Sequence, residues 1–155
     1  MSLVAKILSP SHVVADLQAS SKKRLFEQAG LLFENHDKIG RSVVFDSLFA
    51  REKLGSTGLG QEIAIPHGRI KGLKQALGAF VRPRQPIPFD APDGKPVAQV
   101  FVLLVPEQAT EAHLQLLSEL AQMFSDKSFR EQLAAATDPA EVHALFARWQ
   151  EAPAA

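Results

Sequence analysis

The sequence has 155 residues, 46% of them hydrophobic, and we expect one domain over 1–155 with an ordered core from about 4 to 150. Lys plus Arg equals Asp plus Glu at 17 each, and this balance argues against nucleic-acid binding and against attraction to an anionic membrane. The absence of cysteine excludes thiol chemistry and cysteine-ligated zinc. The longest apolar run, 100–105, is far shorter than the roughly 20 residues of a membrane span, so we expect no membrane insertion and a cytoplasmic protein.

The first third of the chain predicts a short strand and two helices. Residues 12–17 predict the strand, and a serine at position 20 or 21 offers an N-cap for a helix that runs to about His36. The basic residues 22–24 in its first turns are expected to form a solvated face. A second helix is predicted over about 42–54, before a glycine at which it would end.

The middle of the chain changes to strand-like patterns. Residues 62–66, 77–82 and 97–105 predict strands, and the last is a nearly continuous apolar run, which is typical of a strand buried on both faces. The segment 83–96 holds five of the ten prolines and an Asp-Gly turn. We therefore expect an irregular connection there.

The last third predicts three helices. Thr110 can cap a helix that runs to Phe124, Asp126 a shorter helix to about Ala135, and Asp138 a final one. Early helices, then clustered strands, then three helices indicate an α/β fold in which a mixed sheet is covered on both faces.

A glycine-rich loop precedes the first of the middle strands. Gly55, Gly58 and Gly60 surround Ser56 and Thr57, so the backbone can turn sharply and approach a ligand closely. The loop is not of the Walker type, because no Lys-Ser or Lys-Thr follows its last glycine, and its spacing differs from the dinucleotide fingerprint. In isolation the loop is equally compatible with ligand binding and with a structural role as a helix end followed by a flexible connection.

Two histidines are candidates for a site. His67 follows an apolar strand, with Pro66 before it and Gly68 after it, and ligands of α/β sheets usually bind at the carboxyl ends of strands. His113 is in register with apolar residues at offsets of four, seven and eleven along its helix, so it should point toward the sheet and approach His67. The alternative for His113 is a hydrogen-bonded core histidine.

These residues favour phosphoryl transfer to an imidazole. Neutral imidazole, with a reference pKa of about 6.5, has a lone pair that can attack phosphorus. Backbone N–H groups, a second imidazole and the guanidinium of Arg51 could stabilise charge on the equatorial oxygens. A metal site built on His67 and His113 is an alternative, but it lacks a short His-to-His spacing and an obvious third ligand.

Two motifs carry a resemblance to a known family. Gly55 to Gly60 (GSTGLG) and Ile63 to Gly68 (IAIPHG) resemble the active-site signature of the mannitol/fructose-type IIA domains of the phosphotransferase system, particularly the nitrogen-regulatory branch. Leu104-Val105-Pro106 followed by His113-Leu114 is similar to the second motif of the family. The similarity spans nearly the whole chain. It implies a three-layer α/β/α sandwich with a mixed parallel/antiparallel sheet, and neither a metal nor a cofactor.

The resemblance also implies roles. His67 would be the phosphorylated nucleophile, His113 would support the phosphoryl group and Arg51 would stabilise charge, beside a phosphate-binding loop of Gly55, Ser56, Thr57, Gly58 and Gly60. The donor would be a histidine-containing phosphocarrier protein, and the phosphorylation state would govern binding to regulatory targets such as potassium-transport or sensor proteins. The length, without an appended IIB or membrane portion, favours the nitrogen-regulatory branch. A fructose/mannitol transport component and a non-phosphorylated regulatory binding module remain alternatives.

Glu62 departs from the family pattern, since relatives commonly have glycine at this position. A carboxylate directed at a phosphoryl group would oppose it. In a regular strand, however, Glu62 has the opposite parity to His67 and should point to the other face of the sheet.

Overall fold

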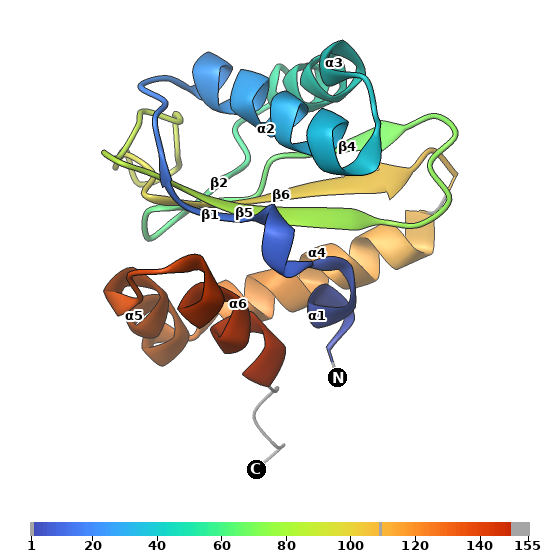
Figure 1. Cartoon of the computed structure of the whole chain (residues 1–155). Helices are drawn as coiled ribbons and strands as arrows, with labels where there is room; N and C mark the ends of the chain where they lie inside the picture. The colour runs from blue at the N-terminus through green and yellow to red at the C-terminus, as the bar shows by residue number, and fades with distance from the viewer. Residues whose placement is uncertain (1, 109, 150–155) are drawn as a thin grey trace.

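A mixed sheet lies between two layers of helices in the computed structural model, which describes residues 2–108 and 110–149 (Figure 1). One face is covered by α2 (Lys22–Asp37) and α3 (Arg41–Glu52). The other is covered by α1 (Leu3–Ile7), α4 (Thr110–Ser125), α5 (Lys127–Ala135) and α6 (Pro139–Arg148). The predicted three-layer α/β/α fold is confirmed. None of the helices in the described ranges has the length and apolar character needed to cross a membrane.

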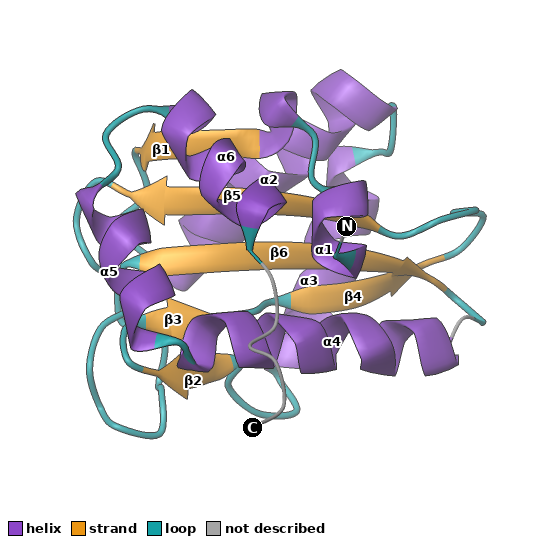
Figure 2. Ribbon diagram, turned by 90° about the horizontal axis from the view of Figure 1, so that it is seen from below, coloured by secondary structure: helices purple, strands orange, loops and turns teal. Residues whose placement is uncertain are grey.

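The sheet is organised around its longest strand. Its strands are β1 (Val13–Leu17), β2 (Gly58–Gly60), β3 (Ile63–Ala64), β4 (His67–Ile70), β5 (Leu77–Pro83) and β6 (Gln99–Pro106). Figure 2 shows β6 with β5 on one side and with β3 and β4 on the other. The β5 strand is antiparallel to β6 and parallel to β1. Strands β3 and β4 are both parallel to β6, and β2 is antiparallel to β3. The predicted mixed sheet is therefore present.

The apolar run of β6 divides between two hydrophobic cores. Successive side chains of a strand point to opposite faces, so the period of two sends alternate residues to each helical layer. Phe101, Leu103 and Val105 pack in the core beneath α4, α5 and α6. Val100, Val102 and Leu104 pack in the core beneath α2 and α3. Burial on both faces explains why the run is continuous rather than alternating.

The helix starts follow the predicted capping residues. The side chains of Ser21, Asp126 and Asp138 each accept a hydrogen bond from a backbone N–H in the first turn of the following helix. This confirms the predicted starts of α2, α5 and α6. The predicted cap at Thr110 concerns a side chain outside the described residues.

The strand predicted over 62–66 is wrong in its extent. Only Ile63 and Ala64 form strand β3, because Glu62 has a positive φ of 67° and Pro66 has no N–H to donate to the ladder. Pairing with β6 resumes in β4, which the sequence did not predict. The short elements β2 and α1 were also not predicted, and β1 begins at Val13 because a 3₁₀ turn (Pro10–His12) precedes it.

Close packing of α3 on β4 requires the glycine after His67. A Cβ atom at Gly68 would lie 2.1 Å from Ser47 Oγ and 3.0 Å from the carbonyl carbon of Ser47. The Ser47 hydroxyl donates a hydrogen bond to the Arg69 carbonyl at 2.9 Å. Because residues four apart share a helix face, Arg51 lies one turn along the same face as Ser47. The contact at Gly68 therefore sets where Arg51 lies relative to β4.

We expect Gly68→Ala to lower the free energy of unfolding by about 1–3 kcal/mol, because the added methyl meets helix backbone as well as a hydroxyl. Urea denaturation measures the loss. Gly40→Ala is the control, since a Cβ there meets only a Val43 methyl at 3.6 Å. Equal losses in the two variants would contradict the close approach of α3 to β4.

Candidate functional site

His67 is the first residue of β4 and pairs with Leu103 of β6. The prediction placed it after the carboxyl end of a strand, and the structure corrects this. His67 follows a two-residue break between β3 and β4, in which Pro66 contributes only its carbonyl to the ladder, accepting from Leu103 N at 2.9 Å. The backbone of His67 is thus part of the sheet, and not of a loop beyond it.

The break also fixes the tautomer of His67. Nδ1 lies 2.9 Å from the carbonyl oxygen of Ile65. A carbonyl can only accept, so Nδ1 carries the proton and Nε2 keeps its lone pair. Burial is the largest influence on the pKa of His67 and lowers it. The hydrogen bond to the Ile65 carbonyl raises the pKa in part, and the smaller effects of Arg51 and Glu52 lower and raise it, respectively. At neutral pH the ring is therefore neutral, and its lone pair is on Nε2.

The structure brings His113 of α4 beside His67. The ring centroids are 5.2 Å apart and the planes meet at 60°, an edge-to-face arrangement. Nε2 of His113 is buried and has no hydrogen-bond partner among the described residues. Burial is the first cause that lowers the pKa of His113, and the proximity of His67, Arg69 and Arg51 adds to it. Two neutral rings therefore lie next to one another, and in each the Nε2 atom makes no hydrogen bond among the described residues.

Arg51 connects the glycine loop to the histidines. Nη1 of Arg51 donates to the Gly55 carbonyl at 2.8 Å, just after α3 ends. A guanidinium has five N–H groups, so others stay available for a ligand. The charge of Arg51 lowers the pKa of both His67 and His113, which places it within electrostatic range of the two rings.

The hydroxyls of the predicted phosphate-binding loop are engaged with protein atoms. Thr57 donates to Glu52 through Oγ1 at 2.6 Å and through its backbone N–H at 3.0 Å. The Ser56 hydroxyl donates to the Phe89 carbonyl at 2.5 Å. Both side chains therefore hold the loop in shape, and a ligand would meet loop backbone in preference to these hydroxyls.

The glycines of the loop serve different positions. Gly55 has a φ of 152° and would have open space around a Cβ. Gly58 lies against Ala91, where a Cβ would come within 2.8 Å of the alanine methyl. Gly60 lies at the β2–β3 turn beside Asp93 and has a φ of 86°. The structure therefore separates Gly60 from the part of the loop that Arg51 holds.

Sequence reasoning missed Glu52, which anchors this loop. Glu52 is 9% exposed and, besides Thr57, accepts from Lys22 Nζ at 2.9 Å. The signal was present, because Val44, Leu48 and Glu52 recur every four residues and all three are buried. The predicted solvated face is wrong for Lys22, whose side chain is 20% exposed and whose ammonium lies 4.8 Å from the centre of the Phe89 ring.

Glu62 is an exposed turn residue and not a strand residue, so the parity argument for it is wrong. Gly60, Gln61 and Glu62 all have positive φ, at 86°, 57° and 67°. This left-handed backbone favours glycine, so a glycine at position 62 would be less strained than glutamate. Glu62 lies next to Ile63, which pairs with Gln99, four residues before the partner of His67 on β6. That offset corresponds to about 13 Å along the strand.

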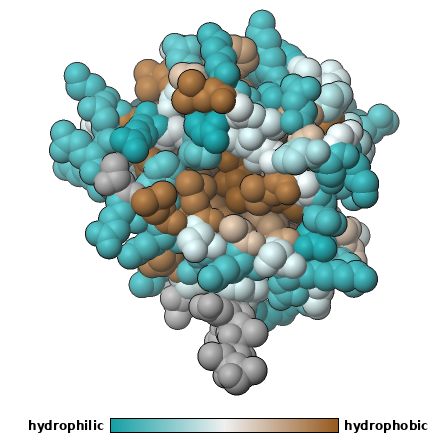
Figure 3. All heavy atoms as spheres, turned by 180° about the vertical axis from the view of Figure 1, so that it is seen from behind, coloured by the Kyte–Doolittle hydropathy of each residue, from teal (hydrophilic) through white to brown (hydrophobic). Residues whose placement is uncertain are grey.

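Apolar side chains are exposed on the segments that form the site. Leu54, between Arg51 and the loop, is 84% exposed, and Leu114, next to His113, is 66% exposed. Figure 3 shows an apolar patch ringed by polar residues on the side of the molecule away from the viewer in Figure 1. Contiguous apolar surface of this kind is typical of protein docking sites.

One known family matches nearly the whole chain. The family described as "Phosphoenolpyruvate-dependent sugar phosphotransferase system, EIIA 2" matches residues 6–149. The chain belongs to this family. The resemblance inferred from the two sequence motifs is confirmed.

Among relatives of this IIA chain, the nitrogen regulatory protein of Pseudomonas aeruginosa is 44% identical over 132 residues, covering 84% of this chain and 86% of the relative. The crystal structure of the nitrogen regulatory protein IIA-Ntr from Neisseria meningitidis superposes with a TM-score of 0.87 at 59% identity, covering 93% and 99% of the two chains. A complex of enzyme IIAMTL with phosphorylated enzyme IIBMTL from Escherichia coli has a TM-score of 0.75 at 23% identity, covering 90% and 96%, which shows a shared fold.

We expect Arg51→Gln to raise the pKa of His67, because it removes a positive charge that opposes protonation of the ring. The titration of the ring proton resonances by NMR measures the change. The exposed Arg148, on α6, supplies the control Arg148→Gln, which should leave the pKa of His67 as it is in the wild type. A lower pKa in Arg51→Gln would contradict the geometry described for the guanidinium.

The same shifts predict a pH dependence of stability. The folded-state pKa values of His67 and His113 lie below their ordinary value, so the unfolded chain binds protons first as the pH falls. The free energy of unfolding therefore keeps its full value, as far as these two rings are concerned, above about pH 6.5. It decreases as the pH falls from there to the folded-state pKa values. Urea denaturation at a series of pH values should show a smaller pH dependence in a His113→Gln variant.

Proposed function

We propose that this protein carries a phosphoryl group on His67, which it accepts from the phosphohistidine of a histidine-containing phosphocarrier protein. The observation that carries the proposal is the hydrogen bond from Nδ1 to the Ile65 carbonyl, which leaves the Nε2 lone pair free on a ring that packs edge to face with His113 and feels the charge of Arg51. Family membership supports the reaction class.

The transfer balances without an added acid or base. The Nε2 lone pair of His67 forms a bond to phosphorus as the phosphorus–nitrogen bond of the donor breaks, and its electrons return to the donor ring. The donor ring, protonated on its other nitrogen, leaves as neutral imidazole. The ring of His67 becomes a phosphoimidazolium whose Nδ1 proton stays hydrogen-bonded to the Ile65 carbonyl.

Three groups are suited to stabilise the transferring phosphoryl group. Arg51 supplies N–H donors and positive charge at the loop. His113 supplies a ring with an uncommitted nitrogen, which as the N–H tautomer donates to a phosphoryl oxygen. The loop supplies the N–H of Ser56, because among the described residues the N–H groups of Thr57 and Gly58 already donate to Glu52 and to Ser56 Oγ.

The proposed output is regulatory. A doubly negative phosphoryl group changes the charge of a surface that otherwise presents exposed leucines, so partners can distinguish the two states. Similarity to nitrogen regulatory proteins at 44% and 59% identity supports regulatory targets, such as potassium-transport or sensor proteins, in the cytoplasm. A fructose-specific EIIA component from Haloferax volcanii, 36% identical over 107 residues, keeps a sugar-transport role as the second candidate.

Reconstitution tests the acceptor. The protein is incubated with enzyme I, the phosphocarrier protein and phosphoenolpyruvate, and peptide mass analysis locates the phosphate. We expect it on His67, with none in His67→Gln, and an approximately 100-fold slower transfer in His113→Gln, which loses one donor to the transition state. The exposed His36 supplies the control variant His36→Gln. Phosphate on His113, or none on the wild type, would refute the proposal and favour a non-phosphorylated binding module.

We expect Glu62→Gly to leave phosphorylation intact or to speed it, because the turn is left-handed and the carboxylate lies away from the ring of His67. Glu62→Gln, which removes the charge and keeps the backbone restriction, separates the two effects. Initial rates in the same reconstituted system measure both variants. A slower Glu62→Gly protein would show that this account of the turn is incorrect.

A further inference from the structure

A polar cavity lies near Gln99, the first residue of β6, four residues before Leu103, the partner of His67. Its volume is about 420 Å³, and its lining includes the cationic residues Arg82, Arg84, Lys127 and Arg130. These come from the end of β5, from the segment after it and from α5, whereas the candidate site is built from α3, β4 and α4. The cavity is therefore separate from the phosphoryl-transfer site.

Two of the four cations have no carboxylate partner. Arg82 makes its hydrogen bonds to backbone carbonyls, those of Ala15 at 3.2 Å, Leu133 at 2.6 Å and Ala136 at 2.6 Å. Arg130 donates to the Phe124 carbonyl at 2.7 Å. Among the described residues, no ion pair includes either guanidinium. Carbonyls orient these groups without cancelling their charge, and each keeps spare N–H donors.

A buried amide faces the same space. Gln99, the first residue of β6, lines the cavity and is 6% exposed, and its Oε1 has no hydrogen-bond partner among the described residues. Buried side-chain amides are normally hydrogen-bonded. Rotation about the last torsion of the side chain is soft, so Gln99 can offer either its oxygen or its NH₂ to a ligand.

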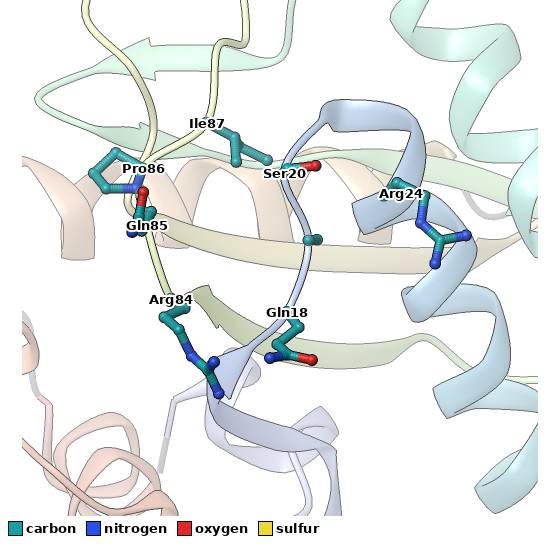
Figure 4. A pocket seen from close by; sticks show the side chains of 8 residues that line it. Gln18, Ser20, Arg24, Arg84, Gln85, Pro86 and Ile87 are labelled. Carbon is teal, nitrogen blue, oxygen red and sulfur yellow. The ribbon is translucent and has the colours of Figure 1, made fainter.

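In a neighbouring cavity of about 460 Å³, by contrast, the arginine charges are paired with carboxylates (Figure 4). Its two arginines, Arg24 and Arg84, extend from α2 and from the segment after β5. Arg24 is paired with Glu27 at 2.6 Å, and Arg84 holds both carboxylate oxygens of Asp16 at 3.0 Å. Its cations are therefore satisfied within the protein, unlike Arg82 and Arg130.

We propose that the cavity between Arg82 and Arg130 binds the carboxylate or phosphate group of a small molecule, with Gln99 hydrogen-bonding to it. Planar guanidinium groups match both oxyanions through paired N–H donors. Two carboxylates, Glu62 and Glu131, also line the cavity. They disfavour a bare polyanion and favour a ligand that also carries a hydroxyl or amino group. This binding is independent of phosphoryl transfer at His67.

The test is a titration of the full chain carrying His67→Ala, which removes the proposed phosphoryl acceptor, with inorganic phosphate and separately with malonate at constant ionic strength. NMR follows the Gln99 side-chain amide and the Arg130 Nε resonance. We expect saturable shifts of both, and the probe that binds more tightly identifies a phosphate or a carboxylate ligand. No saturable shift with either probe would overturn the proposal and leave water as the partner of Gln99.

Two variants locate the binding. Gln99→Met keeps the length of the side chain without its amide, and Arg130→Gln removes one guanidinium; each should weaken binding at least about tenfold. Arg148→Gln, on an exposed position of α6, is the charge-matched control and should bind like the parent. Thermal unfolding checks that each variant is folded. If Arg130→Gln does not fold, the affinity of Gln99→Met alone decides the test. Unchanged affinity in a folded Gln99→Met or Arg130→Gln variant would show an adventitious ion only.

Discussion

The hydrogen bond between His67 Nδ1 and the Ile65 carbonyl is the constraint on which the rest of the site depends. It exists because Pro66 cannot donate to the ladder, so pairing with β6 is interrupted and a carbonyl next to the ring is left to accept. Without that bond, either nitrogen of the ring could carry the proton. With it, the lone pair is assigned to Nε2, and burial keeps the ring neutral.

The groups around that nitrogen come from three separated parts of the chain, and close packing brings them together. The absence of a side chain at Gly68 lets α3 lie directly on β4, which positions Arg51. The core beneath α4 orients His113 toward the sheet. Glu52 accepts hydrogen bonds from Lys22 and from Thr57, and the bonds to Thr57 fix the glycine loop. The site is thus a product of the same packing that stabilises the fold.

Charge is distributed differently around His67 and around Gln99, although the formal net charge of the chain is zero. Near His67, the charges of Arg51 and Arg69 act on two rings that are neutral at physiological pH, which suits a group that gains and loses a phosphoryl anion. Near Gln99, the guanidinium groups of Arg82 and Arg130 are held by carbonyls and keep their charge. Overall neutrality therefore conceals two local positive environments with different chemistry.

Signals that are local in the chain were enough to predict the caps at Ser21, Asp126 and Asp138, the buried strand β6, the layered α/β fold and the family, because each depends on residues only a few positions apart. Helical spacing also predicted that His113 would point toward the sheet. The ion pair of Glu52 with Lys22 and the hydrogen bond of the Ser56 hydroxyl to Phe89 were decided by tertiary contacts. Partners such as Phe89 and Lys22 lie tens of residues from the atoms they bind, so no local pattern could assign them.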